Sequence, residues 1–210
     1  MDHDFWHERW DLNQIGFHES EANALMVSNL DALDLAPGAR VFLPLCGKTR
    51  DIAWLLDRGY RVVGAELSEK AVRALFAEMD FAPEVSEQGR LRRFSGPDID
   101  ILAGDVFNVT AEALGPVDAV YDRAALVALP SGTRPRYAAH VHDITGGARQ
   151  LLICFEYDQN VMPGPPFSVD AAEVGRVHAP RYGLKRLAAL PVDGGLKGKC
   201  PATETVWLLT

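Results

Sequence analysis

The sequence predicts an α/β fold built on a single doubly wound, mostly parallel sheet of seven strands, with an antiparallel strand at the C-terminus and a helical cover at the N-terminus. Three observations support this prediction. Strand-like and helix-like runs alternate from residue 40 onward, which favours a parallel sheet with helices on its faces. The last two strand-like runs have no helix between them, so we expect them to pair antiparallel. Helical patterns occupy the first 35 residues.

The N-terminal segment shows two helical patterns. Residues 5–12 carry Trp6 and Trp10 at helical spacing, and a turn-like segment follows. Residues 19–33 place apolar side chains at a period near 3.6, which predicts one amphipathic helix that ends before Pro37.

The remaining elements follow in order along the chain. Apolar runs and turn residues predict strands at 40–45, 60–66, 91–94, 99–103, 117–121, 149–155, 184–190 and 205–209. We expect 91–94 and 99–103 to pair with each other, with the second of them joining the main sheet. Helices are predicted at 50–56, 69–79 and 136–144.

Length and composition are those of one globular domain spanning 1–210, in which residues 1–35 form the cover. The formal net charge of -8 and the pI near 5.2 disfavour nucleic acid and anionic lipid as partners. No apolar run approaches the ~20 residues that span a bilayer, and the acidic N-terminus lacks a signal-peptide pattern. We therefore expect a cytoplasmic protein without membrane partners, and a monomer.

Cysteine and histidine give no metal-binding pattern. The three cysteines, Cys46, Cys154 and Cys200, have the wrong spacing for zinc, and we interpret them as reduced structural thiols. The six histidines show no ligand spacing and are expected at the surface. We therefore predict no metal site.

The ends of the first two strands carry the strongest site signal. In open parallel sheets, ligands bind beyond the carboxyl ends of the strands. Gly47 in the first turn allows close backbone approach to a ligand. Glu66 ends the second strand, 21 residues after Leu45, which is the spacing of a ribose-binding acid. The alternative is a solvated carboxylate at a strand end.

The same turn discriminates between cofactors. A dinucleotide site uses a GxGxxG turn to hold the pyrophosphate, whereas Pro44-Leu45-Cys46-Gly47-Lys48 has one glycine and a bulky leucine. S-adenosylmethionine (SAM) carries no phosphate and tolerates such a turn. An NAD-dependent oxidoreductase is the disfavoured alternative.

Five sequence motifs, in order along nearly the whole chain, resemble the thiopurine S-methyltransferase family of Rossmann-like, SAM-dependent methyltransferases. They are Trp6 and Trp10 with Gly16-Phe17-His18, then 42–48 (FLPLCGK), 63–69 (VGAELSE), 121–129 (YDRAALVAL) and 163–167 (PGPPF).

The resemblance implies a methyl transfer from SAM, with S-adenosylhomocysteine as product, to a thiol or selenium-type small molecule. By matching positions, the implied cofactor-binding residues are Trp10, Leu45, Glu66, Asp105, Val106 and Arg123. The implied acceptor-binding residues are Phe17 and Arg123, and 163–167 is expected to be a rigid wall beside the acceptor.

Other interpretations of these residues remain open. The alternative for Trp6 and Trp10 is that they pack a helix onto the sheet, and the alternative for Arg123 is that it pairs with Asp122 or caps a helix. Two departures from the animal enzymes leave the acceptor range open: Ala124 replaces a glycine, and 193–199 lacks an arginine.

The chemistry itself leaves the function partly open. Thiopurine thiols and selenols ionise readily, so no catalytic base is assigned. Methylation of selenium or tellurium compounds, as a detoxification, and a SAM-binding sensor without turnover stand as alternatives.

Overall fold

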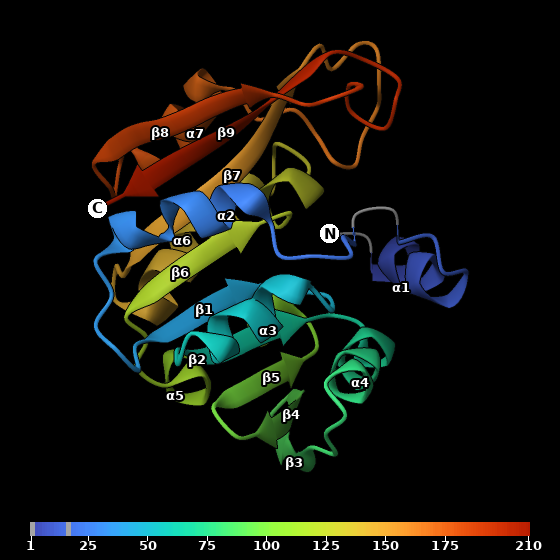
Figure 1. Ribbon diagram of the computed structural model, residues 1–210, viewed down its shortest axis with the longest axis vertical. Coiled ribbons are helices and arrows are strands. Elements are labelled where there is room, and N and C mark those ends of the chain that lie inside the picture. Colours follow the sequence, from blue (N-terminus) through green and yellow to red (C-terminus); the bar gives the residue numbers. More distant parts are fainter. Residues whose placement is uncertain (1–2, 16–17) are drawn as a thin grey trace.

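The computed structural model describes residues 3–15 and 18–210, and these form an α/β fold around one mixed sheet (Figure 1). The sheet order is β3-β4-β5-β2-β1-β6-β7-β9-β8. The strands are β1 (Arg40–Pro44), β2 (Arg61–Glu66), β3 (Glu84–Gln88), β4 (Leu91–Gly96), β5 (Ile99–Ala103), β6 (Ala119–Arg123), β7 (Arg149–Tyr157), β8 (Leu184–Pro191) and β9 (Ala202–Leu209).

Helices flank the sheet and connect its strands. The α-helices are α1 (His3–Asp11), α2 (Ala24–Asn29), α3 (Arg50–Asp57), α4 (Glu69–Glu78), α5 (Ala111–Leu114), α6 (Arg134–Thr145) and α7 (Ala171–His178). Short 3-10 turns form η1 (Leu30–Leu33), η2 (Val106–Asn108) and η3 (Leu126–Ala128). None of the helices within the described residues is both long and apolar enough to cross a membrane.

The predicted fold class is confirmed, but the predicted strand number is wrong. The described residues form nine strands, of which β5, β2, β1, β6 and β7 run parallel. β3 and β4 extend one edge and β9 and β8 the other, all antiparallel to their neighbours. β3 escaped prediction because its sequence, EVSEQ, is polar and almost wholly exposed, so no apolar pattern marks it.

The predicted helix over 19–33 is also wrong in its extent. Asn23 caps the N-terminus of α2, because its Oδ1 accepts hydrogen bonds from the amides of Leu25 and Met26. The helix tightens into η1 at Leu30 and ends at Asp34, whose φ of +52° is left-handed. The apolar period of the sequence therefore continues across the N-cap and the 3-10 turn, so it does not mark where the α-helix begins and ends.

Two apolar clusters form the core, one on each face of the sheet. One cluster joins the strands to α2, α3 and α4, and the other joins them to α6 and α7. This arrangement is the double winding that the alternating pattern predicted. The parallel strands end at the edge where α1 lies (Figure 1), so the fold brings the N-terminal helix to the carboxyl ends of the strands.

Candidate functional site

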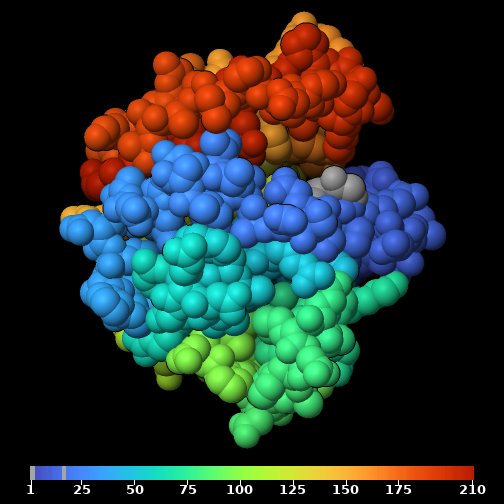
Figure 2. Space-filling view, viewed as in Figure 1, coloured from blue at the N-terminus to red at the C-terminus, as the bar shows by residue number. Residues whose placement is uncertain are grey.

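A cavity of about 630 Å³ lies at the carboxyl ends of β1, β2, β6 and β7. Residues of α1 and of the C-terminal loop before β9 also line it. In the space-filling view the N-terminal residues lie between α4 and the C-terminal loops (Figure 2). The position agrees with the rule that ligands bind beyond the carboxyl ends of parallel strands.

Glu66, the last residue of β2, lines the floor of this cavity. Its carboxylate accepts hydrogen bonds from the amides of Gly47 and Ser68, both at 2.8 Å. The residue is only 7% exposed, so the alternative of a solvated carboxylate is wrong. Burial raises the pKa of Glu66, although the amides of Ser68 and Gly47 counteract the shift.

The turn after β1 forms the adjoining wall. Leu45 and Gly47 both have positive φ, +50° and +55°, and both line the cavity. Trp10 lies directly over this turn, because a Cβ added to Gly47 would meet the indole Cζ2 at 3.2 Å. Trp10 is 6% exposed and lines the cavity together with Trp6. The structure therefore brings together three of the predicted cofactor-binding residues, Trp10, Leu45 and Glu66.

Asp105 and Val106 follow β5, the neighbour of β2, but do not contribute to the lining of this cavity. The Asp105 carboxylate caps η2 by accepting from the amide of Phe107 at 3.0 Å, and its other oxygen lies 3.3 Å from His3 Nε2. Val106 is buried, and its carbonyl oxygen lies 2.9 Å from His140 Nε2. Both residues thus follow β5 at the carboxyl-terminal edge of the sheet and lie outside the cavity lining.

Arg123 ends β6 and lines the cavity with its side chain 10% exposed. It forms an ion pair with Glu19, so the alternative pairing with Asp122 is wrong. Asp122 instead accepts hydrogen bonds from the Tyr137 hydroxyl at 2.7 Å and the Leu126 amide at 3.1 Å. Burial lowers the pKa of Arg123, but the charges of Tyr121, Glu19 and Asp51 outweigh burial and leave it raised.

Ala124, the departure noted beside Arg123, also lines the cavity. Its φ is +63°, in the left-handed region where a glycine carries less strain. A glycine at this position would adopt the same conformation with less strain. Phe17, the predicted acceptor-binding residue, lies outside the described residues.

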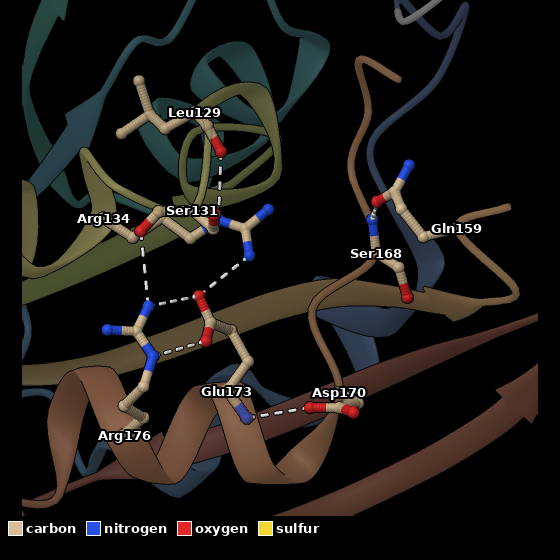
Figure 3. Close-up of polar contacts among 8 residues, drawn as sticks. All are labelled: Leu129, Ser131, Arg134, Gln159, Ser168, Asp170, Glu173 and Arg176. Carbon is tan, nitrogen blue, oxygen red and sulfur yellow. Dashed lines mark hydrogen bonds and ion pairs between the residues drawn. The ribbon is translucent and has the colours of Figure 1, made fainter. Parts of the chain in front are cut away.

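The segment 163–166, predicted to be a rigid wall, lines the same cavity as Glu66. Lys197 Nζ donates to the Pro165 carbonyl at 2.9 Å and thereby joins the C-terminal loop to this wall. Behind the wall, the Ser168 amide donates to Gln159 Oε1 at 2.7 Å (Figure 3). Hydrogen bonds thus fix the wall at Pro165 and the chain just after it at Ser168.

A buried ion-pair network supports the helices behind the wall (Figure 3). Arg134 of α6 donates to Glu173 of α7 at 2.9 Å and to the Leu129 carbonyl at 3.0 Å. Arg176 forms a second, bidentate pair with Glu173. Phe167, at the end of the wall segment, lies 5.8 Å from the Arg134 guanidinium. The network ties α6 and α7 to the end of the wall.

Sequence reasoning missed several cavity residues. Glu19, Lys197, Lys199 and Glu204 line it, and they come from segments with no strong motif of their own. The apolar part of the lining includes Phe155, Met162, Val192 and Leu196. The lining therefore combines apolar side chains with charged ones, and Lys197 and Lys199 come from the same C-terminal loop as Leu196.

The cysteines and histidines have mainly structural positions. All three cysteines are buried and reduced, as expected. His178 is buried, so the expectation that all histidines lie at the surface is wrong. Across residues 3–15 and 18–210, no three His, Cys, Asp or Glu side chains are grouped as a metal site would require.

Comparisons with known proteins agree with the geometry. The family described as thiopurine S-methyltransferase (TPMT) matches residues 1–197. A thiopurine S-methyltransferase of Xanthobacter autotrophicus is 58% identical over 210 residues, covering 100% of this chain and 99% of that protein. One from Gluconobacter oxydans is 46% identical, covering 97% and 92%.

A solved structure shows the same fold at low sequence identity. The Burkholderia thailandensis 1,6-didemethyltoxoflavin-N1-methyltransferase, with bound 1,6-didemethyltoxoflavin and S-adenosylhomocysteine, matches with a TM-score of 0.67 and 17% identity. The match covers 99% of this chain and 87% of that one.

Proposed function

Because this chain belongs to the thiopurine S-methyltransferase family and is a SAM-dependent methyltransferase, we propose that it methylates the sulfur of thiopurines and related aromatic or heterocyclic thiols. One observation carries the proposal: a single cavity is lined both by Glu66 and Gly47 and by the segment 163–166 with the apolar side chains of Phe155, Met162, Val192 and Leu196. The first group of residues suits a nucleoside and the second a flat, apolar acceptor.

The residues at the carboxyl ends of β1 and β2 fit SAM. Glu66 offers a buried carboxylate to ribose hydroxyls, and Gly47 leaves room for close backbone approach beneath Trp10. We assign Leu45 to contact with the cofactor in the same turn, and Asp105 and Val106 to the adenine. When bound, SAM supplies a methyl group on a sulfonium.

We assign the segment 163–166 and the apolar lining residues to the acceptor. In-line methyl transfer depends mainly on distance and alignment, so a rigid wall contributes by fixing the acceptor's orientation. Arg123 lines the same cavity and is assigned to orient the acceptor. Phe17 is assigned to acceptor binding from its sequence motif alone.

Several wider features belong to the same proposal. The chain acts as one domain, 1–210, with residues 1–35 as the cover, and works as a monomer in the cytoplasm. Selenium or tellurium compounds are further candidate acceptors, because selenols share the soft, readily ionised character of thiols.

The test is direct. We expect methyl-labelled SAM and 6-mercaptopurine to give label on the purine sulfur when the purified protein is added. Transfer to no thiol or selenol acceptor, despite SAM binding, would overturn the proposal in favour of a SAM-binding sensor.

A further inference from the structure

Three cationic side chains, Arg9 of α1 and Lys197 and Lys199 of the C-terminal loop, line the cavity. Both lysines are exposed, which places them where the cavity opens to solvent. The chain as a whole carries a formal net charge of -8, so this gathering of positive charge is a local feature. A positive field at the opening of a binding cavity favours ligands of negative charge.

The turn that carries the two lysines is fixed in place. Leu196 and Cys200 are buried, and the Leu196 amide donates to the Cys200 carbonyl at 2.8 Å, which closes the turn. Lys197 has a φ of +53°, a conformation that residues other than glycine rarely adopt. Its Nζ donates to the Pro165 carbonyl at 2.9 Å. The turn therefore holds the Lys197 ammonium against the wall formed by 163–166.

The partners of these three cations are neutral. Lys197 donates to a carbonyl oxygen, and Arg9 donates to the side-chain oxygen of Gln14. The Arg9 guanidinium also lies 4.7 Å from the centroid of the Phe5 ring. Within residues 3–15 and 18–210, no carboxylate forms an ion pair with any of the three. Their positive charge is therefore left uncompensated by the protein.

The other two lysine and arginine side chains that line the cavity differ in this respect. Arg123 pairs with the carboxylate of Glu19, and Lys48 pairs with that of Glu78. Both of these cations thus have a counter-ion within the protein. The uncompensated charge is confined to α1 and the C-terminal loop.

The three uncompensated charges also repel one another. Partial burial lowers the pKa of Lys197, and the charges of Lys199 and Arg9 lower it further. Like charges that are held together without a counter-ion are unfavourable. An anion bound between α1 and the C-terminal loop would offset this repulsion.

We propose that Arg9, Lys197 and Lys199 form an anion subsite, which binds a carboxylate or phosphate group that the acceptor carries on the side away from its thiol. The lysines lie at the opening, whereas the reacting sulfur must reach the methyl group inside the cavity. Lys197 has ammonium protons that the Pro165 carbonyl does not use, and Arg9 offers a planar fork to an oxyanion. The inference rests on the proposed function and deepens it, because it names the class of acceptor that the cavity selects.

A matched pair of acceptors tests the subsite. 4-Mercaptobenzoate carries a carboxylate opposite its thiol, and 4-mercaptobenzamide has nearly the same shape without the charge. For Lys197→Gln we expect kcat/KM to fall about 10-fold or more with the benzoate and less than about threefold with the benzamide. Glutamine can still donate to the Pro165 carbonyl, so the variant removes the charge and not the contact with the wall.

Two further variants and a change of salt serve as controls. Lys197→Arg keeps the charge and should keep the preference for the benzoate. Lys185→Gln, on the exposed edge strand β8 and outside the cavity lining, removes the same charge from the protein and should change neither acceptor. Added salt should lower kcat/KM of the wild type for the benzoate and leave that for the benzamide nearly constant.

The carboxylate of the cofactor is the competing anion. We expect the Kd for S-adenosylhomocysteine, measured by isothermal titration calorimetry, to change less than about threefold in Lys197→Gln. A rise in this Kd that matches the loss of kcat/KM with the benzoate would show that the cations hold the cofactor. That result would overturn the proposal.

A binding measurement requires no turnover. With S-adenosylhomocysteine bound, the Kd for 4-(methylthio)benzoate, the methylated product, should rise about 10-fold in Lys197→Gln, and the Kd for 4-(methylthio)benzamide should not change. Equal effects on the charged and uncharged ligands, or no effect on either, would overturn the subsite while leaving the proposed function intact. If the wild type methylates neither acceptor nor 6-mercaptopurine, the proposed function fails, and this binding measurement still decides whether the anion subsite exists.

Discussion

Glu66 Oε2 accepts a hydrogen bond from the Gly47 amide at 2.8 Å, and this contact joins the end of β2 to the turn after β1. The other carboxylate oxygen accepts from Ser68 at the start of α4. One side chain thus fixes two loops at the cavity floor and remains within reach of a ribose.

Removing this carboxylate should weaken cofactor binding. Hydrogen bonds to a charged group contribute about 1.5–3 kcal/mol, so we expect Glu66→Ala to raise the Kd for S-adenosylhomocysteine about 10-fold to 100-fold. Isothermal titration calorimetry measures this directly. Glu84→Ala, on the exposed edge strand β3, is the control and should bind as the wild type does. An unchanged Kd in Glu66→Ala would contradict the assignment.

Gly47 gives a test of the Trp10 cover. Gly47→Ala places a Cβ 3.2 Å from the indole and forces a side chain onto a φ of +55°. Gly59→Ala has the same kind of backbone strain, with φ +78°, but no atom within 4 Å of the added Cβ. Each variant should lose about 1 kcal/mol of unfolding free energy, while only Gly47→Ala loses cofactor affinity. Equal cofactor affinities in the two variants would show that the Trp10 contact is unimportant.

Most of the fold could be predicted because its signals are periodic. The parallel strands β1 and β2 and the helices α3 and α4 alternate with clear apolar patterns, and Glu66 follows from a spacing along the chain. The same approach failed for β3. Its residues are polar and exposed, and the strand is held in place only by its pairing with β4.

The missed site residues lack any local signal. Glu204, one of the missed residues, is distant in sequence from the predicted Arg123, and only the antiparallel return of β9 beside β7 brings it into the cavity lining. The pairing of Arg123 with Glu19 depends in the same way on how the N-terminal segment crosses the strand ends. Such contacts arise from tertiary packing, which a motif search cannot detect.

The pairing of Arg123 with Glu19 predicts competition with anionic acceptors. Glu19→Gln removes the competing carboxylate, so we expect a lower KM for 2-mercaptobenzoate and little change for an uncharged aromatic thiol. Arg123→Ala should lower kcat/KM for 2-mercaptobenzoate by about 10-fold or more, since a charged contact is lost. Steady-state kinetics with both acceptors provide the measurement. A neutral effect of Arg123→Ala would rule out its role in orienting anionic acceptors.

The ion-pair network behind the wall predicts that Glu173 and Arg176 contribute unequally to the free energy of unfolding. Glu173→Ala leaves the Arg134 guanidinium, which is 4% exposed, without its carboxylate, so we expect a loss of about 3 kcal/mol in unfolding free energy. Arg176→Ala removes a half-exposed partner of the same carboxylate and should cost less than about 1 kcal/mol. Urea denaturation compares the two. Equal losses would mean that the buried pair with Arg134 contributes no more to the unfolding free energy than the half-exposed pair with Arg176.

From the burial of His178 we predict how the free energy of unfolding changes as the pH falls. Both ring nitrogens are buried and, among the described residues, without hydrogen-bond partners. Burial, with a smaller contribution from Arg181, lowers the pKa of His178 from 6.5 to about 4. The unfolded chain therefore binds a proton before the folded chain does. The stabilising contribution of the neutral ring is complete above pH 6.5 and is lost as the pH falls towards 4, a loss of about 3 kcal/mol.

The buried Asp122 carboxyl has the opposite effect on stability over nearly the same pH range as His178, so the test must compare variants. Burial raises the pKa of Asp122 from 3.8 to about 6, which adds stability as the pH falls from 6 towards 3.8. His178→Leu removes only the histidine contribution. Its unfolding free energy, measured by urea denaturation between about pH 4 and 7.5, should fall less steeply in acid than that of the wild type. The exposed His7→Leu is the control, and a His178→Leu profile parallel to the wild type would refute the assignment.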